Sequence, residues 1–288
     1  MSASSRVPVV GAASSRASAT WGSLSLGGKI SLLMLLTLTL VAVFGPALAP
    51  HDPLERVGQA MMPPGTDGFL FGTDQSGRDL LSRTLEGVRT TWLGAVVVLA
   101  ATAMFGALIG VWAGSTRGVV DSVLMRVTDV FLSLPAPIVA IAVVAAIGSS
   151  LGNALLAIAI VWWPWYARIV RNEVAALSAR PHVEAARLAG VRGVRLRTHH
   201  LLPGALPTLV VAATLDVGAL ILTLTALSFL GLGAPDPAPE LGAMIASGSS
   251  YVLDQPWLVL VPSIAITFMT LCAGMAGDTI GGMLGRRQ

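Results

Sequence analysis

The sequence contains one pentapeptide with the spacing of a hydrolase nucleophile. Residues 148–152 read "GSSLG" and match the G-x-S-x-G pattern, in which the serine sits on a turn between a strand and a helix. Here the pentapeptide separates two long apolar segments, so we expect a turn between helices. An intramembrane serine hydrolase would also need a histidine within a helix, whereas we expect all four histidines in loops: His51, His182, His199 and His200. We therefore predict no catalytic residue.

Nucleotide and metal sites are not predicted either. The phosphate-binding loop requires glycine, four residues, and then Gly-Lys-Ser/Thr. The only lysine is Lys29, which is followed by Ile30, and Ser23 stands where the first glycine should be. The adjacent side chains of His199 and His200 diverge, so we do not expect them to share a metal ion. The single Cys272 allows neither an internal disulfide nor a cysteine metal cluster.

The composition predicts a membrane protein. Hydrophobic residues make up 54% of the 288 residues and charged residues 11%, against roughly 25% charged in a soluble domain. A bilayer core is spanned by about 20 helical residues, and six apolar runs approach or exceed that length. They are residues 30–49, 90–114, 130–147, 151–166, 205–233 and 257–276, of which the fifth contains Asp216. We predict an all-α integral membrane protein with six transmembrane helices.

The distribution of lysine and arginine predicts the orientation. Cytoplasmic loops of membrane proteins carry an excess of these residues. With both termini in the cytoplasm, that side holds fourteen of the 18 basic residues, and the other side holds Arg56, Arg78, Arg83 and Arg89. We therefore expect a multi-pass protein of the inner or plasma membrane. The excess of basic residues on the cytoplasmic side also accounts for the pI of about 9.7. Nucleic acid is therefore not an expected partner.

The densest positive charge follows the fourth apolar run. Residues 184–203 read "EAARLAGVRGVRLRTHHLLP". Pro181 suits a helix start, Glu184 suits the positive end of the helix dipole, and Gly190 suits a left-handed closing residue. We expect a short cytoplasmic helix over residues 182–189. Its alanines would let another protein surface approach closely, but the helix could instead lie on the lipid surface, and composition alone does not decide.

This segment resembles the EAA loop of binding-protein-dependent ABC importer permeases. The pattern is Glu-Ala-Ala, three residues, glycine, nine residues, isoleucine, one residue, and Leu-Pro. The matching residues are Glu184, Ala185, Ala186, Gly190, Leu202 and Pro203, while His200 replaces the isoleucine. The resemblance implies a type I permease fold in which this loop is a coupling helix, seated in a groove of an ATPase subunit.

Three further segments resemble the C-type permease subunit of dipeptide and oligopeptide transporters. They are "FGTDQSGRDLLSR" (71–83), "MRVTDVFLSLP" (125–135) and "ALSFLGLGAPDPAPELGAM" (226–244). Leu241, Gly204 and the C-terminal tail depart from the family pattern. The resemblance implies four kinds of partner: a second, homologous permease, two ATPase subunits that bind ATP and Mg, an extracytoplasmic substrate-binding protein, and membrane lipid. No cofactor is expected on this chain itself.

Other polar and small residues suggest structural roles. Arg126 and Asp129 are spaced i,i+3, so we expect them to pair. Asp216 could line a translocation path or hydrogen-bond across helices, and both remain open. We prefer a structural role near the second permease and the docked binding protein for the external motif Gly72, Thr73, Asp74, Gly77, Arg78 and Asp79.

Prolines and glycines should shape the helices. Pro135 and Pro137 should kink or interrupt the third helix. Gly106, Gly110 and Gly114 repeat at the small-xxx-small spacing that favours close helix contact. Between the first two spans, we expect an external loop with short helical pieces over residues 51–89.

The predicted organisation has four parts. Residues 1–28 form a disordered cytoplasmic tail, 29–89 the first helix and an extracytoplasmic loop, 90–282 the permease core, and 283–288 a second cytoplasmic tail. The expected function is import of dipeptides or oligopeptides by alternating access, powered by separate ATPase subunits, so the chain itself is not expected to be an enzyme. The same permease type could import nickel or another small solute. An intramembrane hydrolase is disfavoured by the missing helical histidine, and a channel by the EAA loop.

Overall fold

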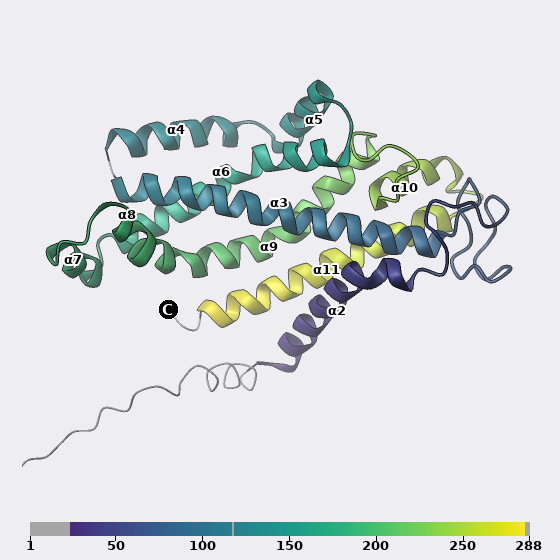
Figure 1. Cartoon of the computed structure of the whole chain (residues 1–288), viewed down its shortest axis with the longest axis horizontal. Coiled ribbons are helices and arrows are strands. Elements are labelled where there is room, and N and C mark those ends of the chain that lie inside the picture. Colours follow the sequence, from purple (N-terminus) through teal and green to yellow (C-terminus); the bar gives the residue numbers. More distant parts are fainter. Residues whose placement is uncertain (1–23, 117, 286–288) are drawn as a thin grey trace, which may run out of the picture.

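The computed structural model describes residues 24–116 and 118–285, and this part of the chain is helical (Figure 1). The predicted tail over residues 1–28 lies almost entirely outside the described residues, as do residues 286–288. The helices are α2 (Leu26–Leu48), α3 (Leu80–Thr116), α4 (Val119–Ser133), α5 (Ala136–Ile147), α6 (Leu151–Leu177), α7 (Pro181–Leu188), α8 (Gly193–Leu196), a π-helical turn η1 (Arg197–Leu201), α9 (Leu202–Phe229), α10 (Leu241–Gly248), a 3₁₀ turn η2 (Ser249–Tyr251) and α11 (Trp257–Gly285).

Five segments are long and apolar enough to cross a membrane, and α4 with α5 makes a sixth if the bent pair is one span. The five are α2, α3, α6, α8 to α9, and α11. This agrees with the six predicted runs, although most observed helices extend beyond them. The helices are longer than the apolar runs because a helix continues past the hydrocarbon core until a turn residue or a cap ends it.

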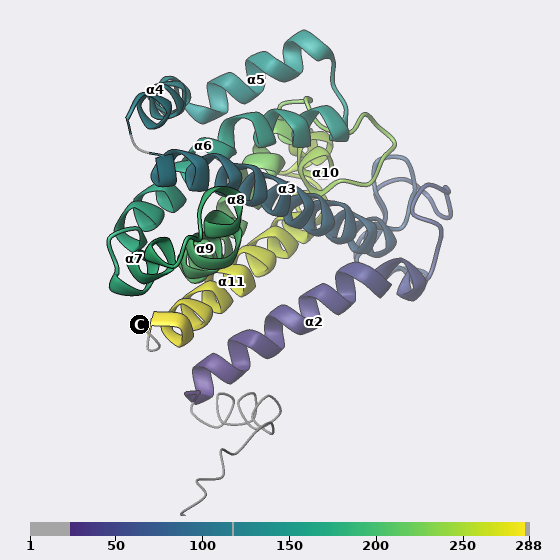
Figure 2. The ribbon, with the colours of Figure 1, turned by 60° about the vertical axis from the view of Figure 1, so that its left-hand side comes forward.

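The third span is broken at Pro135. Helices α4 and α5 meet at an angle of 88°. Leu134, the residue before the proline, has φ −96° and ψ 142°, the extended conformation that a following proline enforces. The expected interruption by proline is confirmed. At its other end α4 follows Gly118, whose φ of +79° is readily adopted only by glycine. Figure 2 shows α4 and α5 along one side of the bundle.

Helix α3 is the central element and begins earlier than expected. Its first turn is capped by Asp79, whose Oδ2 accepts a hydrogen bond from the Ser82 backbone N–H at 2.9 Å. Residues 80–89 therefore belong to α3, and residues 51–79 form turns and two isolated bridges rather than the expected helical pieces. The 37 residues of α3 span about 55 Å at 1.5 Å per residue.

The glycine repeat on α3 faces α6. A Cβ atom at Gly106, Gly110 or Gly114 would lie 2.6 Å from a backbone carbonyl oxygen of α6, namely that of Trp163, Ala167 or Arg171. No side chain fits at that distance, so these glycines let the two backbones approach closely. The helix contact that the small-xxx-small spacing predicts is confirmed.

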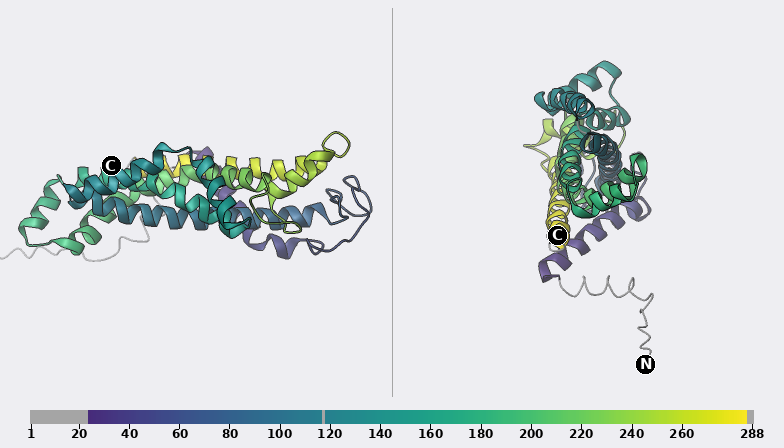
Figure 3. Two further views of the ribbon diagram at one scale, coloured as in Figure 1. Left: turned by 90° about the horizontal axis from the view of Figure 1, so that it is seen from above. Right: turned by 90° about the vertical axis from the view of Figure 1, so that its left-hand side faces the viewer.

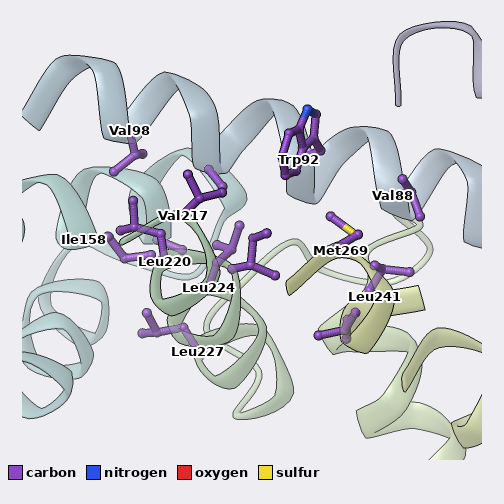
Figure 4. Close-up of a cluster of buried hydrophobic side chains, with 14 of the residues drawn as sticks. Val88, Trp92, Val98, Ile158, Val217, Leu220, Leu224, Leu227, Leu241 and Met269 are labelled. Carbon is purple, nitrogen blue, oxygen red and sulfur yellow. The ribbon is translucent and has the colours of Figure 1, made fainter. Parts of the chain in front are cut away.

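Two hydrophobic clusters hold the bundle together. The larger one joins α3, α6, α9, α10 and α11 through side chains such as Trp92, Ile158, Leu224, Leu241 and Met269 (Figure 4). The second cluster lies toward the α7 end and gathers Tyr166, Val170, Val174 and Leu177 of α6 with residues of α7 to α9. The second cluster therefore positions the α7 region on the spans.

The connecting segments gather at the two ends of the bundle. Helices α7 and α8 lie at one end, and the loop before α3 lies at the other end with the segment around α10 (Figures 1 and 3). Helix α9 begins directly after α8 and η1 and ends near α10. It thus joins the α7 end to the opposite end.

Candidate functional site

Helix α7 contains the Glu184, Ala185 and Ala186 triplet and is nearly free of contacts with the spans. It runs from Pro181 to Leu188 and has one buried residue, Val183. Glu184 and Ala185 are exposed, and Leu188 is 86% exposed. The helix agrees with the segment expected from sequence, displaced by one residue at each end.

The end of α7 is closed by Gly190. Its φ is +85°, and its N–H donates to the Arg187 carbonyl at 3.0 Å, while the Val191 N–H donates to the Ala186 carbonyl at 3.0 Å. These two bonds form a Schellman motif, which satisfies the last helix carbonyls. Gly190 thereby sets the direction in which the chain leaves α7.

Side chains of the second cluster fix the α7–α8 segment to the spans. Val183 is fully buried, as is Leu201, and Leu196 is 7% exposed. They pack with Val174 and Leu177 of α6. The remaining residues of the EAA pattern, Leu202 and Pro203, form the first turn of α9. The EAA residues are therefore split between an exposed helix and the start of a membrane span.

Arg197 attaches the same segment to α3. Its Nε donates to the Ser115 hydroxyl at 2.8 Å, and its guanidinium lies 4.1 Å from the centre of the Trp112 ring. A guanidinium over an indole face is a favourable cation–π contact. This residue was not singled out from sequence, because its partners are more than 80 positions away in the chain.

The external motif is held together by its own side chains. The Thr73 hydroxyl donates to the Gln59 carbonyl at 2.6 Å. Asp74 Oδ1 accepts from the Ser76 and Arg78 backbone N–H groups at 2.7 and 2.9 Å, and Asp79 caps α3. The side chains of Asp74 and Arg78 are 5% and 8% exposed. This inward arrangement supports a structural role for the motif.

The two glycines of the motif allow close backbone contacts. Gly72 and Gly77 have φ values of +77° and +82°. A Cβ at these positions would lie 2.2 Å from the Met62 carbonyl oxygen and 2.3 Å from that of Gly58. Neither position accepts a side chain without moving the neighbouring backbone, so both glycines are required by the fold of the loop.

Two buried polar residues hold the segment before α10: Arg83 joins it to the external loop, and Glu240 joins it to the end of α9. Arg83 Nη1 donates to the Pro53 and Pro237 carbonyls at 3.0 and 3.1 Å. The carboxylate of Glu240, 1% exposed, accepts hydrogen bonds from the Ser228 hydroxyl and from the Ala234 N–H. Burial raises the pKa of the Glu240 carboxyl above its usual value, and the two hydrogen bonds partly oppose this. Neither residue was singled out from sequence.

Asp216 hydrogen-bonds across helices. Its Oδ2 accepts from the Tyr166 hydroxyl at 2.9 Å, and Tyr166 is fully buried. This contact corresponds to one of the two alternatives left open by the sequence. Asp216 remains partly accessible, so a place beside a path is compatible with the same contact.

The expected ion pair between Arg126 and Asp129 is not formed. Asp129 pairs with Arg168 of α6 instead, and Asp121 of α4 accepts two hydrogen bonds from Arg171. The i,i+3 rule applies to neighbours on one exposed helix, whereas α4 turns its carboxylates toward the arginines of α6. Two interhelical ion pairs therefore replace the predicted local pair.

Comparison with known proteins identifies the family of this chain. The profile of the family described as binding-protein-dependent transport system inner membrane component matches residues 106–288. The probable D,D-dipeptide transport system permease protein DdpC of Escherichia coli K12 is 40% identical over 254 residues, covering 88% of this chain and 85% of that protein. The nickel transport system permease protein NikC of the same organism is 34% identical over 253 residues, covering 88% and 91%.

The structural comparison agrees with the sequence comparisons. A structure of the MetNI methionine ABC transporter in an inward-facing conformation matches with a TM-score of 0.57 at 21% identity, over 70% of this chain and 95% of that chain. This likeness shows the type I permease fold. The resemblance to dipeptide transporter permeases is thus confirmed at the level of the family. The chain belongs to the binding-protein-dependent transport system inner membrane components, and it is a non-catalytic permease subunit of an ABC importer whose ATP is hydrolysed by separate subunits.

Proposed function

We propose that this permease moves dipeptides or oligopeptides across the membrane by alternating access, and that α7 is the helix through which an ATPase subunit drives the motion. One observation carries the coupling role. Helix α7 projects at one end of the bundle with a single buried residue, Val183, so nearly all of its surface is free for another protein.

The attachment of α7 makes it suitable for transmitting force. Val183 seats it on the second cluster, and the Gly190 turn leads to α8, η1 and α9 without a long loop. A displacement of α7 would thus reach α9, a helix of 28 residues that extends toward the opposite end. Interfaces of this kind switch between discrete packings rather than deform continuously.

The proposed assembly contains four further subunits. Two ATPase subunits, which bind ATP and Mg, dock on the α7 helices of this chain and of a homologous second permease, and an extracytoplasmic protein delivers substrate. The α7 end is cytoplasmic in this proposal, as are both termini. The exposed arginines Arg187, Arg192 and Arg195 at that end support this orientation through the positive-inside rule.

The substrate class follows from the relatives. A relative that is 40% identical is named a D,D-dipeptide permease, and another, 38% identical over 260 residues, is named a di/tripeptide permease. Nickel is the second candidate, because a relative that is 34% identical is named a nickel permease. The binding protein selects the cargo in this proposal, so the two candidates must be separated by transport measurements.

Uptake measurements test both parts of the proposal. Cells with the complete transporter should take up a labelled dipeptide, and cells lacking this chain should not. Glu184→Arg and Gly190→Trp should abolish uptake while the chain still inserts in the membrane, because the first reverses a charge on α7 and the second places a side chain at φ +85°. Gly152→Ala is the matched control, since no atom lies within 4 Å of its added Cβ.

The possible failures are distinguishable. Nickel uptake without peptide uptake would replace the substrate but leave the coupling role intact. Peptide uptake that survives both α7 substitutions, with the ATPase subunits still bound to the complex, would refute the coupling role and leave the substrate intact.

A further inference from the structure

One arginine of the α7–α8 region turns toward the spans. Five arginines lie between residues 180 and 197, and four of them are exposed: Arg180, Arg187, Arg192 and Arg195. Arg197 is partly buried, and its guanidinium contacts Trp112 and Ser115 of α3. The positive-inside rule does not require such a contact, because a solvated arginine satisfies it equally well. The placement of Arg197 therefore needs a reason of its own.

The contact combines two interactions on one guanidinium. The Ser115 hydroxyl accepts from Arg197 Nε at 2.8 Å and donates to the Trp112 carbonyl at 3.2 Å. The guanidinium carbon lies 4.1 Å from the centre of the Trp112 ring, within the range of about 6 Å for cation–π attraction. A planar guanidinium can stack on an indole and donate from its edge at the same time, whereas an ammonium is a point charge. The contact thus fixes both the position and the orientation of the Arg197 side chain.

Arg197 stands near the start of one continuous helix. Residues Gly193–Phe229 form a helix of 37 residues, in which α8 passes through η1 into α9. The π-helical turn η1 runs from Arg197 to Leu201, and turns of this kind within helices are frequent at functional sites. Leu201 is fully buried in the second cluster. The turn therefore contributes one apolar and one charged contact with the spans.

These contacts give α7 a second connection to the spans. Along the chain, a displacement of α7 reaches α9, and through Arg197 it also reaches the last turn of α3. At this level α3 packs tightly on α6, because a Cβ at Gly114 would lie 2.6 Å from the Arg171 carbonyl oxygen. We propose that Arg197 is a positioning residue for coupling, which holds the α8–α9 helix on α3 so that α3 and α6 follow α7 together with α9. This inference rests on the proposed coupling role of α7.

The amount of substrate imported per ATP hydrolysed tests the role of Arg197. It is measured in the purified complete transporter, reconstituted in vesicles with its binding protein and with labelled dipeptide or nickel, whichever the uptake measurements identify. Arg197→Ala should lower this ratio about fivefold, or roughly 1 kcal/mol, which lies within the range by which residues between two coupled sites alter the coupling. ATP hydrolysis should continue, because the exposed surface of α7 is unchanged. Arg197→Lys, which keeps a cation beside the ring, should retain more of the ratio.

A purely structural role predicts a different result. It would lower the amount of intact complex, measured by size-exclusion chromatography, and leave the ratio of import to hydrolysis unchanged in the complex that remains. That outcome in Arg197→Ala would overturn the proposal. The exposed Arg195, on the same helix, provides the matched control Arg195→Ala, which should keep the wild-type ratio. An equal loss in both variants would also overturn the proposal, because charge rather than the contact with α3 would then be responsible.

Substitutions of Trp112 test the partner. Trp112→Leu should lower the ratio as Arg197→Ala does, and Trp112→Phe, which keeps an aromatic face, should retain part of it. The double variant Arg197→Ala with Trp112→Leu should be no worse than either single variant, because both remove the same contact. Fully additive losses would contradict the proposal.

Failure of this inference is distinguishable from failure of the proposed function. Uptake that survives Glu184→Arg would remove the coupling role of α7 itself. Uptake that is abolished by Glu184→Arg, together with a wild-type ratio in Arg197→Ala, would overturn only the role of Arg197.

Discussion

The Tyr166 hydroxyl donates a hydrogen bond to Asp216 Oδ2 at 2.9 Å, joining α6 to α9 within the membrane-spanning part of the protein. The tyrosine is fully buried and the aspartate is partly buried. A polar pair in this environment has few alternative partners, so each residue depends on the other.

Removing the donor should loosen this contact. We expect Tyr166→Phe to destabilise the protein by about 1–3 kcal/mol, the range for a buried acceptor that is left unsatisfied. Asp216→Asn, which retains an acceptor oxygen, should have a smaller effect. Thermal inactivation of the solubilised transporter, followed by size-exclusion chromatography, measures both. Equal stability of Tyr166→Phe and wild type would show that the bond does not contribute.

The glycine seam between α3 and α6 should not tolerate a methyl group. A Cβ at Gly110 would lie 2.6 Å from the Ala167 carbonyl oxygen and 2.8 Å from Val170 Cβ, so Gly110→Ala must separate the helices. Overpacking of this kind costs about 1–3 kcal/mol. The yield of folded complex and its thermal stability should both fall, whereas Gly152→Ala, at an open position on α6, should match the wild type. Normal stability of Gly110→Ala would contradict the close packing.

A charge exchange tests the partner of Asp129. Asp129→Arg should reduce the amount of folded transporter, because it faces Arg168. The double variant Asp129→Arg with Arg168→Asp should recover part of the loss. Asp129→Arg with Arg126→Asp is the matched control and should recover less. The amount of intact complex in the membrane measures all three, and the opposite order of recovery would favour the local i,i+3 pair.

The buried Glu240 makes stability depend on pH. Burial raises the pKa of its carboxyl in the folded protein, so the folded state holds a proton that the unfolded state has already released. The resulting stabilisation is complete below the ordinary glutamate pKa of about 4.3 and is lost as the pH rises through the folded value. Glu240→Gln removes this titration; its amide oxygen can still accept from the Ala234 N–H, while its amide nitrogen can only donate, so the Ser228 hydroxyl must turn to accept. Melting temperatures of the two proteins should therefore differ more at pH 8 than at pH 4.5, and parallel curves would contradict the prediction.

The sequence predicted the spans well because their signals are local. The spans are marked by long apolar runs, the break in the third span by the proline at 135, and the close helix contact by the glycines at 106, 110 and 114. Each of these features affects the chain within a few residues of its own position. The short helix before Gly190 followed from the same kind of rule. The start of α3 was missed by ten residues, because the cap of Asp79 lies inside a polar segment whose composition suggests a loop.

The polar contacts could not be predicted to the same extent. The sequence identifies Asp129 and Asp216 as charges in or beside spans, but their partners Arg168 and Tyr166 are 39 and 50 positions away in the chain. Which arginine meets Asp129 depends on the rotation of α4 against α6. That rotation is set by tertiary packing, and the spacing of residues along one sequence does not predict it.

The inward-facing charges of the external motif have a consequence for the evolution of this protein. Asp74, Arg78 and Asp79 are buried and bond within the loop and to its neighbours. If a substrate-binding protein docks at this end, as proposed, it would therefore meet other, exposed residues of the loop, such as Leu54, Glu55 and Arg56. Substitutions at those exposed positions would then alter the docking surface without breaking the buried hydrogen bonds of Asp74, Arg78 and Asp79. Under the proposed function, such a permease would be able to change its binding protein, and with it the transported substrate, without loss of its own stability.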